Sequence, residues 1–584
     1  MPLSNARMQV IILKPRSVIF LSIGQIQHEG EIKYMDYQRL ANLLFPDITT
    51  TPADIEAMYP PRSLPEGAKV TRIAPSPTGF MHLGNLFSAI VSERLAHQSG
   101  GVFFLRIEDT DLKRAVEGGV ETIIRVFNHY GLNFDEGATI EGDKGAYGPY
   151  RQRQRAKIYQ TFAKVLVEQG LAYPCFCTEE ELNEMRQQQQ EMKINFGYYG
   201  QWAKCRDLTF EQIEENIQAG KPYVLRFRSP GDPNKRFVHR DLVKGDIELP
   251  ENDQDIVLLK SDGIPTYHFA HVIDDHFMGT THVVRGEEWL ATLNIHLQLF
   301  RTLGWKPPKY VHTAQLMKMD GGSKRKLSKR KDPELALDFY NAEGYPVPSV
   351  LEYLMTLLNS NFEDWRIANP TAPMDDFQFT TKKMGNSGSL FDIDKLKDVS
   401  KNTISVMSAD EVYNEVTGWA KDYDQQLYTL LTADEQKAKA IFAIGRGGAK
   451  PRKDIAIWSE VKDYLAFFYD ELYVPAVEYP ENVAKEDAIA ILTQYKGIYS
   501  PADDGDTWFN KVRELGETLG FAAKPKDYKK NPDQFKGHVG DVSQVIRLAI
   551  TGRTNSPDLC SVMQILGEAT CQQRLDEAIA TLSK

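Results

Sequence analysis

Between residues 69 and 150, strand-like and helix-like hydrophobic patterns alternate along the chain. Apolar runs at 69–74 and 102–107 are each followed by a segment with helical spacing, at 83–97 and 117–130. Strands that alternate with helices predict a parallel sheet of the doubly wound type. The same pattern returns from residue 264 to about 314. We therefore predict one α/β, Rossmann-type domain, built from residues 69–150 and 263–318.

The segment between these two halves, residues 151–262, has a different pattern. It contains a Gln-rich helix over 178–193, which Thr178 and Glu181 can open as a capping box. Three further runs, at 223–228, 237–240 and 255–260, look like antiparallel strands. We predict an α+β insertion here.

The remaining parts of the chain are helical or belong to an N-terminal extension. Beyond Lys331 the pattern is mostly helical with breaks at Pro and Gly clusters, and we predict a linking region at 319–400 and an all-helical region at 401–584. Residues 1–68 form an extension that ends in a Pro-rich linker. Its first 34 residues look detached from the rest of the chain, and Met35 is an alternative start of the native protein.

Composition narrows the class of protein. A chain of 584 residues is too long for one hydrophobic core. The net charge of −11 argues against a wholly basic nucleic-acid-binding surface, although local basic clusters leave RNA contacts open. Five cysteines are too few for a disulfide framework, and no apolar run approaches the roughly 20 residues of a membrane span. We expect a cytoplasmic protein.

Two short segments about 240 residues apart carry candidate chemistry. The first, residues 75–85, is a Gly-bounded turn between a strand and a helix, and a turn of this kind presents backbone N–H groups and the positive end of a helix dipole to an anion. The second, residues 326–330, is a Lys- and Ser-rich loop. Alone, the first could hold an ordinary capping histidine and the second could be a solvated basic loop. Together they predict a site for nucleotide phosphates.

These segments resemble the two signatures of class I aminoacyl-tRNA synthetases, in Arg72-x-Ala-Pro-Ser-Pro-Thr-Gly-x-x-His82-x-Gly84 and in Lys326-Leu-Ser-Lys329-Arg. The flanking residues are most similar to bacterial-type glutamyl-tRNA synthetases, except that Asn85 stands where Gly or His is commoner. The resemblance implies that the catalytic residues stabilise phosphate charge rather than transfer protons. They are His82, Asn85, Lys326 and Lys329. The residues implied to bind Mg²⁺-ATP are His82, Gly84, Asn85, Glu288 and Lys329.

The resemblance also implies a glutamate pocket, since arginine binds carboxylates bidentately and glutamate presents two of them. In the family, an acidic residue holds the amino group, here Glu108, and the other polar groups address the carboxylates. His271 stands where the family commonly has Asn, which bears on amino-acid stringency, and Arg285 has the alternative of pairing with Glu287. The matching positions are Arg72, Ser76, Glu108, Tyr267, His271 and Arg285.

Three of the five cysteines, Cys175, Cys177 and Cys205, lie in the predicted insertion. Three thiolates are a common zinc set that needs a fourth ligand, and three free buried cysteines are the alternative. Similar synthetases hold a structural zinc ion here with a tyrosine as fourth ligand. The family pattern points to Tyr198, with Tyr199 as the alternative.

As a whole, the resemblance implies ATP-dependent ligation of L-glutamate to tRNA-Glu through glutamyl adenylate, with AMP and pyrophosphate released. It assigns the insertion to the acceptor end of tRNA, residues 319–400 to the stem, and the helical region to the anticodon. We expect a monomer. The alternatives are an enzyme that also charges tRNA-Gln and a non-catalytic tRNA-binding paralogue, which the two intact phosphate motifs disfavour. An enzyme that glutamylates a modified tRNA base would lack the helical half.

Overall fold

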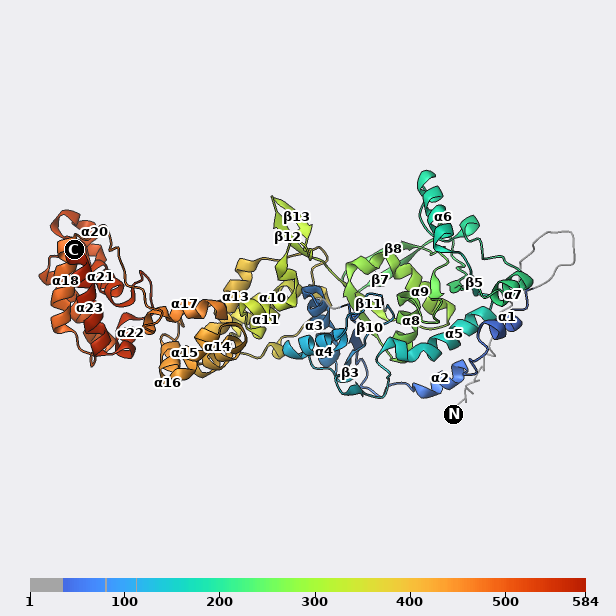
Figure 1. Cartoon of the computed structure of the whole chain (residues 1–584), viewed down its shortest axis with the longest axis horizontal. Coiled ribbons are helices and arrows are strands. Elements are labelled where there is room, and N and C mark those ends of the chain that lie inside the picture. The colour runs from blue at the N-terminus through green and yellow to red at the C-terminus, as the bar shows by residue number, and fades with distance from the viewer. Residues whose placement is uncertain (1–34, 79–80, 112) are drawn as a thin grey trace, which may run out of the picture. The chain divides into compact units, whose positions relative to one another are not determined.

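The computed structural model describes residues 35–78, 81–111 and 113–584 (Figure 1). The first 34 residues, and with them the prediction of an alternative start, lie outside the described residues, as does Gly79 of the first signature. The chain divides into two compact units. We call residues 35–49, 160–229 and 254–257 the insertion unit, and the remainder of the described chain the main unit.

The main unit is built on a parallel sheet, as the sequence pattern predicted. Strand β1 (Val70–Ile73) pairs in parallel with β2 (Val102–Leu105), and β2 pairs in parallel with β3 (Glu136–Thr139). Strand β4 (Gly142–Lys144) closes this edge in the antiparallel direction.

A second parallel pair, β10 (His282–Gly286) and β11 (Lys309–Thr313), continues the sheet on the other side of β1. Here the backbone N–H of Thr281 donates to the carbonyl of Val70 at 2.9 Å.

Helices connect these strands where the helical spacing predicted them. Helix α3 (Leu83–His97) has the predicted limits and packs on β1, β2 and β10, so most of its faces are buried. Three other helices belong to the same part of the main unit, and one of them, α8, is likewise buried on most sides. They are α4 (Gly119–His129), α8 (Tyr267–Phe277) and α9 (Leu293–Thr302).

The insertion unit combines short helices with an antiparallel strand pair, β5 (Ala172–Cys175) and β6 (Val224–Phe227). The predicted capping box is present, because the Thr178 hydroxyl accepts from the N–H of Glu181 and the Glu181 carboxylate accepts from the N–H of Thr178. A cap of this kind contributes about 1 kcal/mol to the stability of a helix. Its helices are α1 (Tyr37–Leu44), α6 (Glu179–Glu191), α7 (Phe210–Gln218) and most of α5 (Ala156–Glu168).

Two further hairpins in the main unit matter for the site. Strands β7 (Arg236–Asp241) and β8 (Gly245–Pro250) form one of them. The other, β12 (Leu316–Asp320) with β13 (Ser323–Lys326), turns at two glycines with positive φ, Gly321 and Gly322. Strand β14 (Ser389–Leu390) pairs in parallel with β12.

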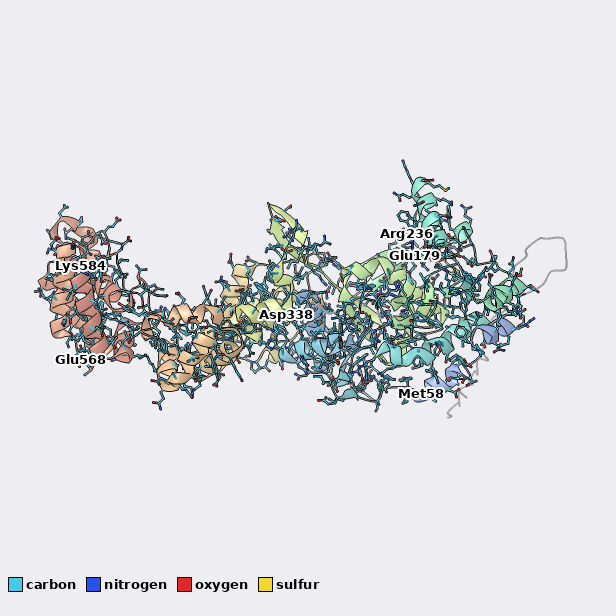
Figure 2. All side chains as sticks on the ribbon, in the orientation of Figure 1. Met58, Glu179, Arg236, Asp338, Glu568 and Lys584 are labelled. Carbon is cyan, nitrogen blue, oxygen red and sulfur yellow. The ribbon has the colours of Figure 1, made fainter. Side chains whose placement is uncertain are left out.

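Two large hydrophobic cores lie in the described part of the main unit, beside a smaller cluster around Val283 and Tyr310. The first joins the sheet to the helices that come after the β12–β13 hairpin, and almost all its members lie between Val70 and Leu396. The second runs from Ile404 to Ala578 and is formed by helices. The chain ends at Lys584, directly after α23 (Figure 2). The helices of these parts are α10 (Leu337–Glu343), α11 (Val347–Leu358), α12 (Phe362–Ala368), α13 (Ile393–Val406), α14 (Ala409–Tyr423), α15 (Gln425–Ala433), α16 (Glu435–Ala443), α17 (Val461–Leu465), α18 (Lys485–Ile498), α19 (Gly505–Thr518), α20 (Pro525–Lys530), α21 (Val539–Thr551), α22 (Leu559–Leu566) and α23 (Glu568–Ser583). Among the described helices, none is long and apolar enough to cross a membrane.

Candidate functional site

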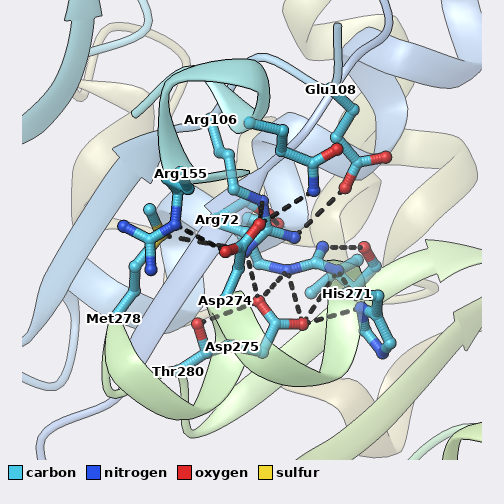
Figure 3. Close-up of polar contacts among 12 residues, drawn as sticks. Arg72, Arg106, Glu108, Arg155, His271, Asp274, Asp275, Met278 and Thr280 are labelled. Atoms are coloured by element: carbon cyan, nitrogen blue, oxygen red, sulfur yellow. Dashed lines mark hydrogen bonds and ion pairs between the residues drawn. The ribbon is translucent and has the colours of Figure 1, made fainter. Parts of the chain in front are cut away.

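A network of buried charges lies where β1 and β2 end and α8 passes beneath them (Figure 3). Its centre is Asp275 on α8, which is 1% exposed. Arg72 on β1 donates to both carboxylate oxygens of Asp275, from Nε at 3.1 Å and from Nη2 at 3.3 Å. Arg106, directly after β2, donates to Oδ1 at 2.7 Å. These two guanidinium groups hold the pKa of Asp275 well below its ordinary value, although burial alone would raise it.

The neighbouring carboxylate, Asp274, is the second centre of the network. Arg155 donates from Nε to Oδ1 at 2.6 Å, the Tyr159 hydroxyl lies 2.9 Å from both oxygens, and Gln152 donates to Oδ2 at 2.9 Å. Arg106 Nε is 3.8 Å away, so that its guanidinium lies between the two aspartates. Breaking a buried pair by removing one partner costs about 3–5 kcal/mol, because an uncompensated charge is left behind. The network therefore fixes Arg72 and Arg106 firmly.

Glu108, two residues after Arg106, faces the same end of the sheet. Its side chain accepts from Arg106 Nη2 at 3.1 Å, and its backbone carbonyl accepts from the Ser76 hydroxyl at 2.6 Å. Burial raises the pKa of Glu108, against the lowering effect of Arg106 and Arg72. A ligand ammonium group at this carboxylate would favour its charged form.

Arg285, at the carboxyl half of β10, is 6% exposed and lies among histidines. Its Nε donates to His312 Nε2 at 3.0 Å, and its Nη1 is 3.1 Å from His296 Nδ1. His312 is in turn held by Asp241 at 2.7 Å through its other ring nitrogen. The alternative pairing with Glu287 does not occur, because Glu287 binds Lys244 and the N–H of Gln315.

Burial keeps the histidines of this region neutral. It lowers the pKa of His271 to about 3 and that of His268 to about 4, and it lowers the pKa of His296 well below its ordinary value. His271 lies 2.8 Å from Asp275 and 3.2 Å from the hydroxyl of Tyr310, one partner for each ring nitrogen.

Tyr267 occupies the first turn of α8, one turn before His271. Its ring stacks on His271 with centroids 5.7 Å apart and lies 4.3 Å from the ring of Trp289. Because α8 carries Tyr267, His271 and both aspartates, one helix positions aromatic, imidazole and carboxylate groups together.

The first signature begins α3. The N–H of His82 donates to the Asn85 side chain at 3.1 Å, so that Asn85 caps the helix at the position where Gly or His is commoner in the family. At Gly84, a Cβ atom would lie 3.0 Å from the imidazole of His82, so a larger residue there would press on that ring. The His82 imidazole is half-buried, and burial together with the positive charges of Lys329 and Lys326 lowers its pKa to about 4.

Because both lysines act on the pKa of His82, the second signature lies close enough to the first for their charges to interact. The basic loop, residues 326–331, begins at the last residue of β13 and is anchored at its base. Arg325 binds Asp332 through both terminal nitrogens, at 2.6 and 2.8 Å, and the same carboxylate accepts from the N–H of Ser328 at 2.8 Å. Leu327 is buried, whereas Lys326 and Lys329 are exposed.

The third cluster lies in the insertion unit. The sulfur atoms of Cys175, Cys177 and Cys205 all lie within 4.8 Å of one another. The Tyr198 hydroxyl is 3.4 Å from Cys175 Sγ and 3.3 Å from Cys177 Sγ, whereas the Tyr199 hydroxyl donates to the carbonyl of Asn195 at 2.7 Å. Three thiols and one phenol oxygen around a common centre form a donor set that suits zinc.

Sequence reasoning missed several side chains that the structure brings into the candidate site. It did not identify Arg106, Asp274, Asp275, His296 or His312 as part of the site. Two adjacent aspartates directly after the apolar pair Val272-Ile273 of α8 were a usable signal, because buried carboxylates need cationic partners. His296 and His312 had no comparable pattern.

Comparisons with known proteins agree with this geometry. The model for class I tRNA synthetases (E and Q), catalytic domain, matches residues 69–398, and an anticodon binding domain matches residues 450–579. Among curated proteins, the chain is 54% identical to the glutamate–tRNA ligase of Acetivibrio thermocellus over 93% of this chain and 100% of the relative. It is 45% identical to the glutamate–tRNA ligase of Sorangium cellulosum over 91% and 99%. Among solved structures, a glutamate tRNA ligase from Elizabethkingia meningosepticum in complex with its amino acid has a TM-score of 0.71 at 27% identity, covering 88% of this chain and 99% of that one.

Proposed function

Because this chain belongs to the class I tRNA synthetases, and within them to the glutamate–tRNA ligases, we propose residue roles for its reaction, the ATP-dependent ligation of glutamate to tRNA. The observation that carries the proposal is the convergence of Arg72, Glu108 and Arg285 around Tyr267, since the charges of all three act on the pKa of its phenol. Arg72 also reaches the carbonyl of Val284, the residue before Arg285, at 3.4 Å. Glu108 holds the substrate ammonium group, and the two guanidinium groups address its carboxylates. Ser76, Tyr267 and His271 complete the pocket.

The phosphate side uses the two signatures. A carboxylate oxygen of glutamate attacks the α-phosphorus of Mg²⁺-ATP, the bond to the pyrophosphate oxygen breaks, and glutamyl adenylate forms. His82, Lys326 and Lys329 stabilise the charge that moves onto the pyrophosphate. Gly84 leaves room for the nucleoside, Asn85 fixes the helix end, and Glu288 borders the ATP site. A hydroxyl of the terminal tRNA adenosine then attacks the adenylate carbonyl, and AMP leaves.

Neutral histidines support these roles. His82 with a pKa of about 4 is uncharged at neutral pH. Its ring N–H donates a hydrogen bond to a phosphate oxygen, and the imidazole neither gains nor loses a proton in the reaction. The same neutrality around Arg285 leaves the guanidinium as the cation that a substrate carboxylate meets.

We also propose that Cys175, Cys177, Cys205 and Tyr198 hold a structural zinc ion. A four-ligand site has no open position for substrate, so the ion would supply folding stability rather than chemistry. The test is metal analysis of the purified protein, expected to give one zinc per chain. The Cys177→Ser variant should lose the metal, whereas Tyr199→Phe should keep it.

The tRNA partner is tRNA-Glu, with tRNA-Gln as the second candidate, and the cytoplasm, where tRNA is charged, is the proposed location. The experiment measures charging of labelled glutamate, with ATP, onto separate tRNA-Glu and tRNA-Gln transcripts. Charging of tRNA-Glu alone makes the enzyme discriminating, and comparable charging of both makes it non-discriminating. Charging of neither would overturn the assigned reaction.

A further inference from the structure

A short segment before the sheet lies against the far side of the charge network. Helix α2 (Pro52–Met58) leads into Tyr59-Pro-Pro-Arg62, which we call the N-terminal strap. The sequence pattern predicts only a linker here. The strap nevertheless contacts the C-terminal end of α8, the helix that carries Tyr267, His271 and both network aspartates.

The first contact is made by Tyr59, which is 7% exposed. Its ring lies 5.5 Å from that of Phe277, the last residue of α8. Its hydroxyl accepts from Arg155 Nη1 at 3.1 Å and donates to the carbonyl of Gly148 at 2.8 Å. Tyr59 thus binds a guanidinium group that is itself fully buried.

The second contact is made by Arg62, whose side chain is 8% exposed. Its Nη1 and Nη2 each lie 2.8 Å from an oxygen of Glu136 on β3, and its Nε donates to the carbonyl of Met278 at 2.9 Å. Met278 is the C-cap of α8, so a cation meets the negative end of the helix dipole. The strap thereby joins the end of α8 to strand β3 of the sheet.

Arg155 connects the strap to the network. The same guanidinium that meets Tyr59 donates from Nε to Asp274 at 2.6 Å (Figure 3). Asp274 and Asp275 flank Arg106, and Asp275 holds Arg72. A continuous set of buried hydrogen bonds and ion pairs therefore runs from Tyr59 to the guanidinium assigned to the substrate carboxylate.

We propose that Tyr59 and Arg62 are positioning residues for glutamate binding. They touch no substrate. They fix Arg155 and the end of α8, and through these the orientation of Asp274, Asp275 and Arg72. This inference rests on the proposed glutamate pocket.

The test compares Tyr59→Phe and Tyr147→Phe in the full-length enzyme. Each variant removes one tyrosine hydroxyl. The Tyr59 hydroxyl belongs to the strap itself and binds Arg155. The Tyr147 hydroxyl donates to the carbonyl of Pro60 in the strap at 2.8 Å and has no part in the Arg155–Asp274 connection. Aminoacylation of tRNA-Glu is measured against glutamate and against ATP, together with Tm. Tyr59→Phe should raise the KM for glutamate about fivefold, the effect of one buried hydrogen bond, and the KM for ATP less than about twofold. Tyr147→Phe should leave both unchanged.

Arg62→Lys gives an independent variant, since lysine keeps the charge but loses the fork between Glu136 and Met278. It should also raise the KM for glutamate selectively, and Arg62→Ala should raise it further. An unchanged KM for glutamate in Tyr59→Phe and Arg62→Lys would overturn the inference, as would an equal rise in Tyr147→Phe. Arg72→Ala distinguishes failure of the proposed glutamate pocket from failure of the strap inference. If this variant charges tRNA normally, the pocket assignment fails. If it is inactive while the strap variants charge normally, only the strap inference fails.

Discussion

Two regions place positive charge at the site but differ in how that charge is held. One is the charge network around Asp274 and Asp275, and the other is the basic loop at 326–331. The network guanidinium groups are buried and bound by carboxylates on several sides. The loop lysines are exposed, and the ion pairs that hold the loop lie at its base, between Arg325 and Asp332. Buried charges are stable only with partners in fixed geometry, whereas an exposed loop anchored at its base can close on phosphates. In the proposed roles, the amino acid meets a preformed pocket, and the phosphates meet a loop that can adjust.

Asp275→Asn should have the largest effect of these variants, because it disrupts the buried charge network. Two buried guanidinium groups would lose their shared carboxylate, and we expect a loss of about 3–5 kcal/mol in the free energy of unfolding together with loss of charging. Urea denaturation and aminoacylation measure the two effects. The matched control is Asp246→Asn, which removes the partner of Arg240 in an exposed pair and should change neither. A fully stable Asp275→Asn protein would contradict the network description.

Lys329→Ala should separate activity from stability on the loop side. We expect kcat to fall by about two orders of magnitude, as for loss of one transition-state contact, with Tm and tRNA binding unchanged. The control is Lys324→Ala, another exposed lysine, on β13. Equal losses in charging and in tRNA binding would argue against a phosphate role.

The pH dependence of stability should reflect the buried side. The pKa of His271 is about 3 in the folded protein and about 6.5 in the unfolded chain, so the unfolded state binds more protons between these values. The free energy of unfolding should fall as the pH drops from about 6.5 towards 4, and His82 and His268 act in the same window. Below about 3.8, protonation of Asp275 in the unfolded chain adds a further loss. Denaturation at several pH values measures this slope, which His271→Asn should flatten; an equal slope in the variant would refute the assignment.

Arg325→Lys should have the smallest effect. Lysine cannot reproduce the two-point contact with Asp332. The base of the loop therefore loosens, while Lys326 and Lys329, the lysines assigned to the phosphates, remain. We expect the KM for ATP to rise about threefold, the effect of one partly exposed contact, with the KM for glutamate unchanged. A selective change in the KM for glutamate would show that loop and network are not separate.

The sequence was sufficient for features that depend on local pattern. The strand–helix alternation, the limits of α3 and the Thr178 capping box are all confirmed, because periodicity and capping act over a few residues. The resemblance to class I synthetases is confirmed by the comparisons. The roles of individual site residues and the domain limits stay predictions.

Features that depend on contacts distant in sequence could not be predicted. Arg106 meets Asp275 169 residues away, and no local pattern specifies that pairing. Of the β12–β13 hairpin, only the basic loop that follows it was predicted, since both strands are short and β13 is wholly polar. The N-terminal strap was predicted as a linker because its two prolines fit one, and its binding surface belongs to residues much later in the chain.

That last separation has a consequence for synthesis of the protein on the ribosome. Arg62 binds the carbonyl of a residue 216 positions later, and at roughly 5–20 residues per second its partner is made about 10–40 s after it. The strap can meet Glu136, Gly148 and Arg155 earlier, but its contacts with α8 cannot form until that helix has emerged. An early segment of the main unit therefore reaches its final contacts only after more than 200 further residues have been made.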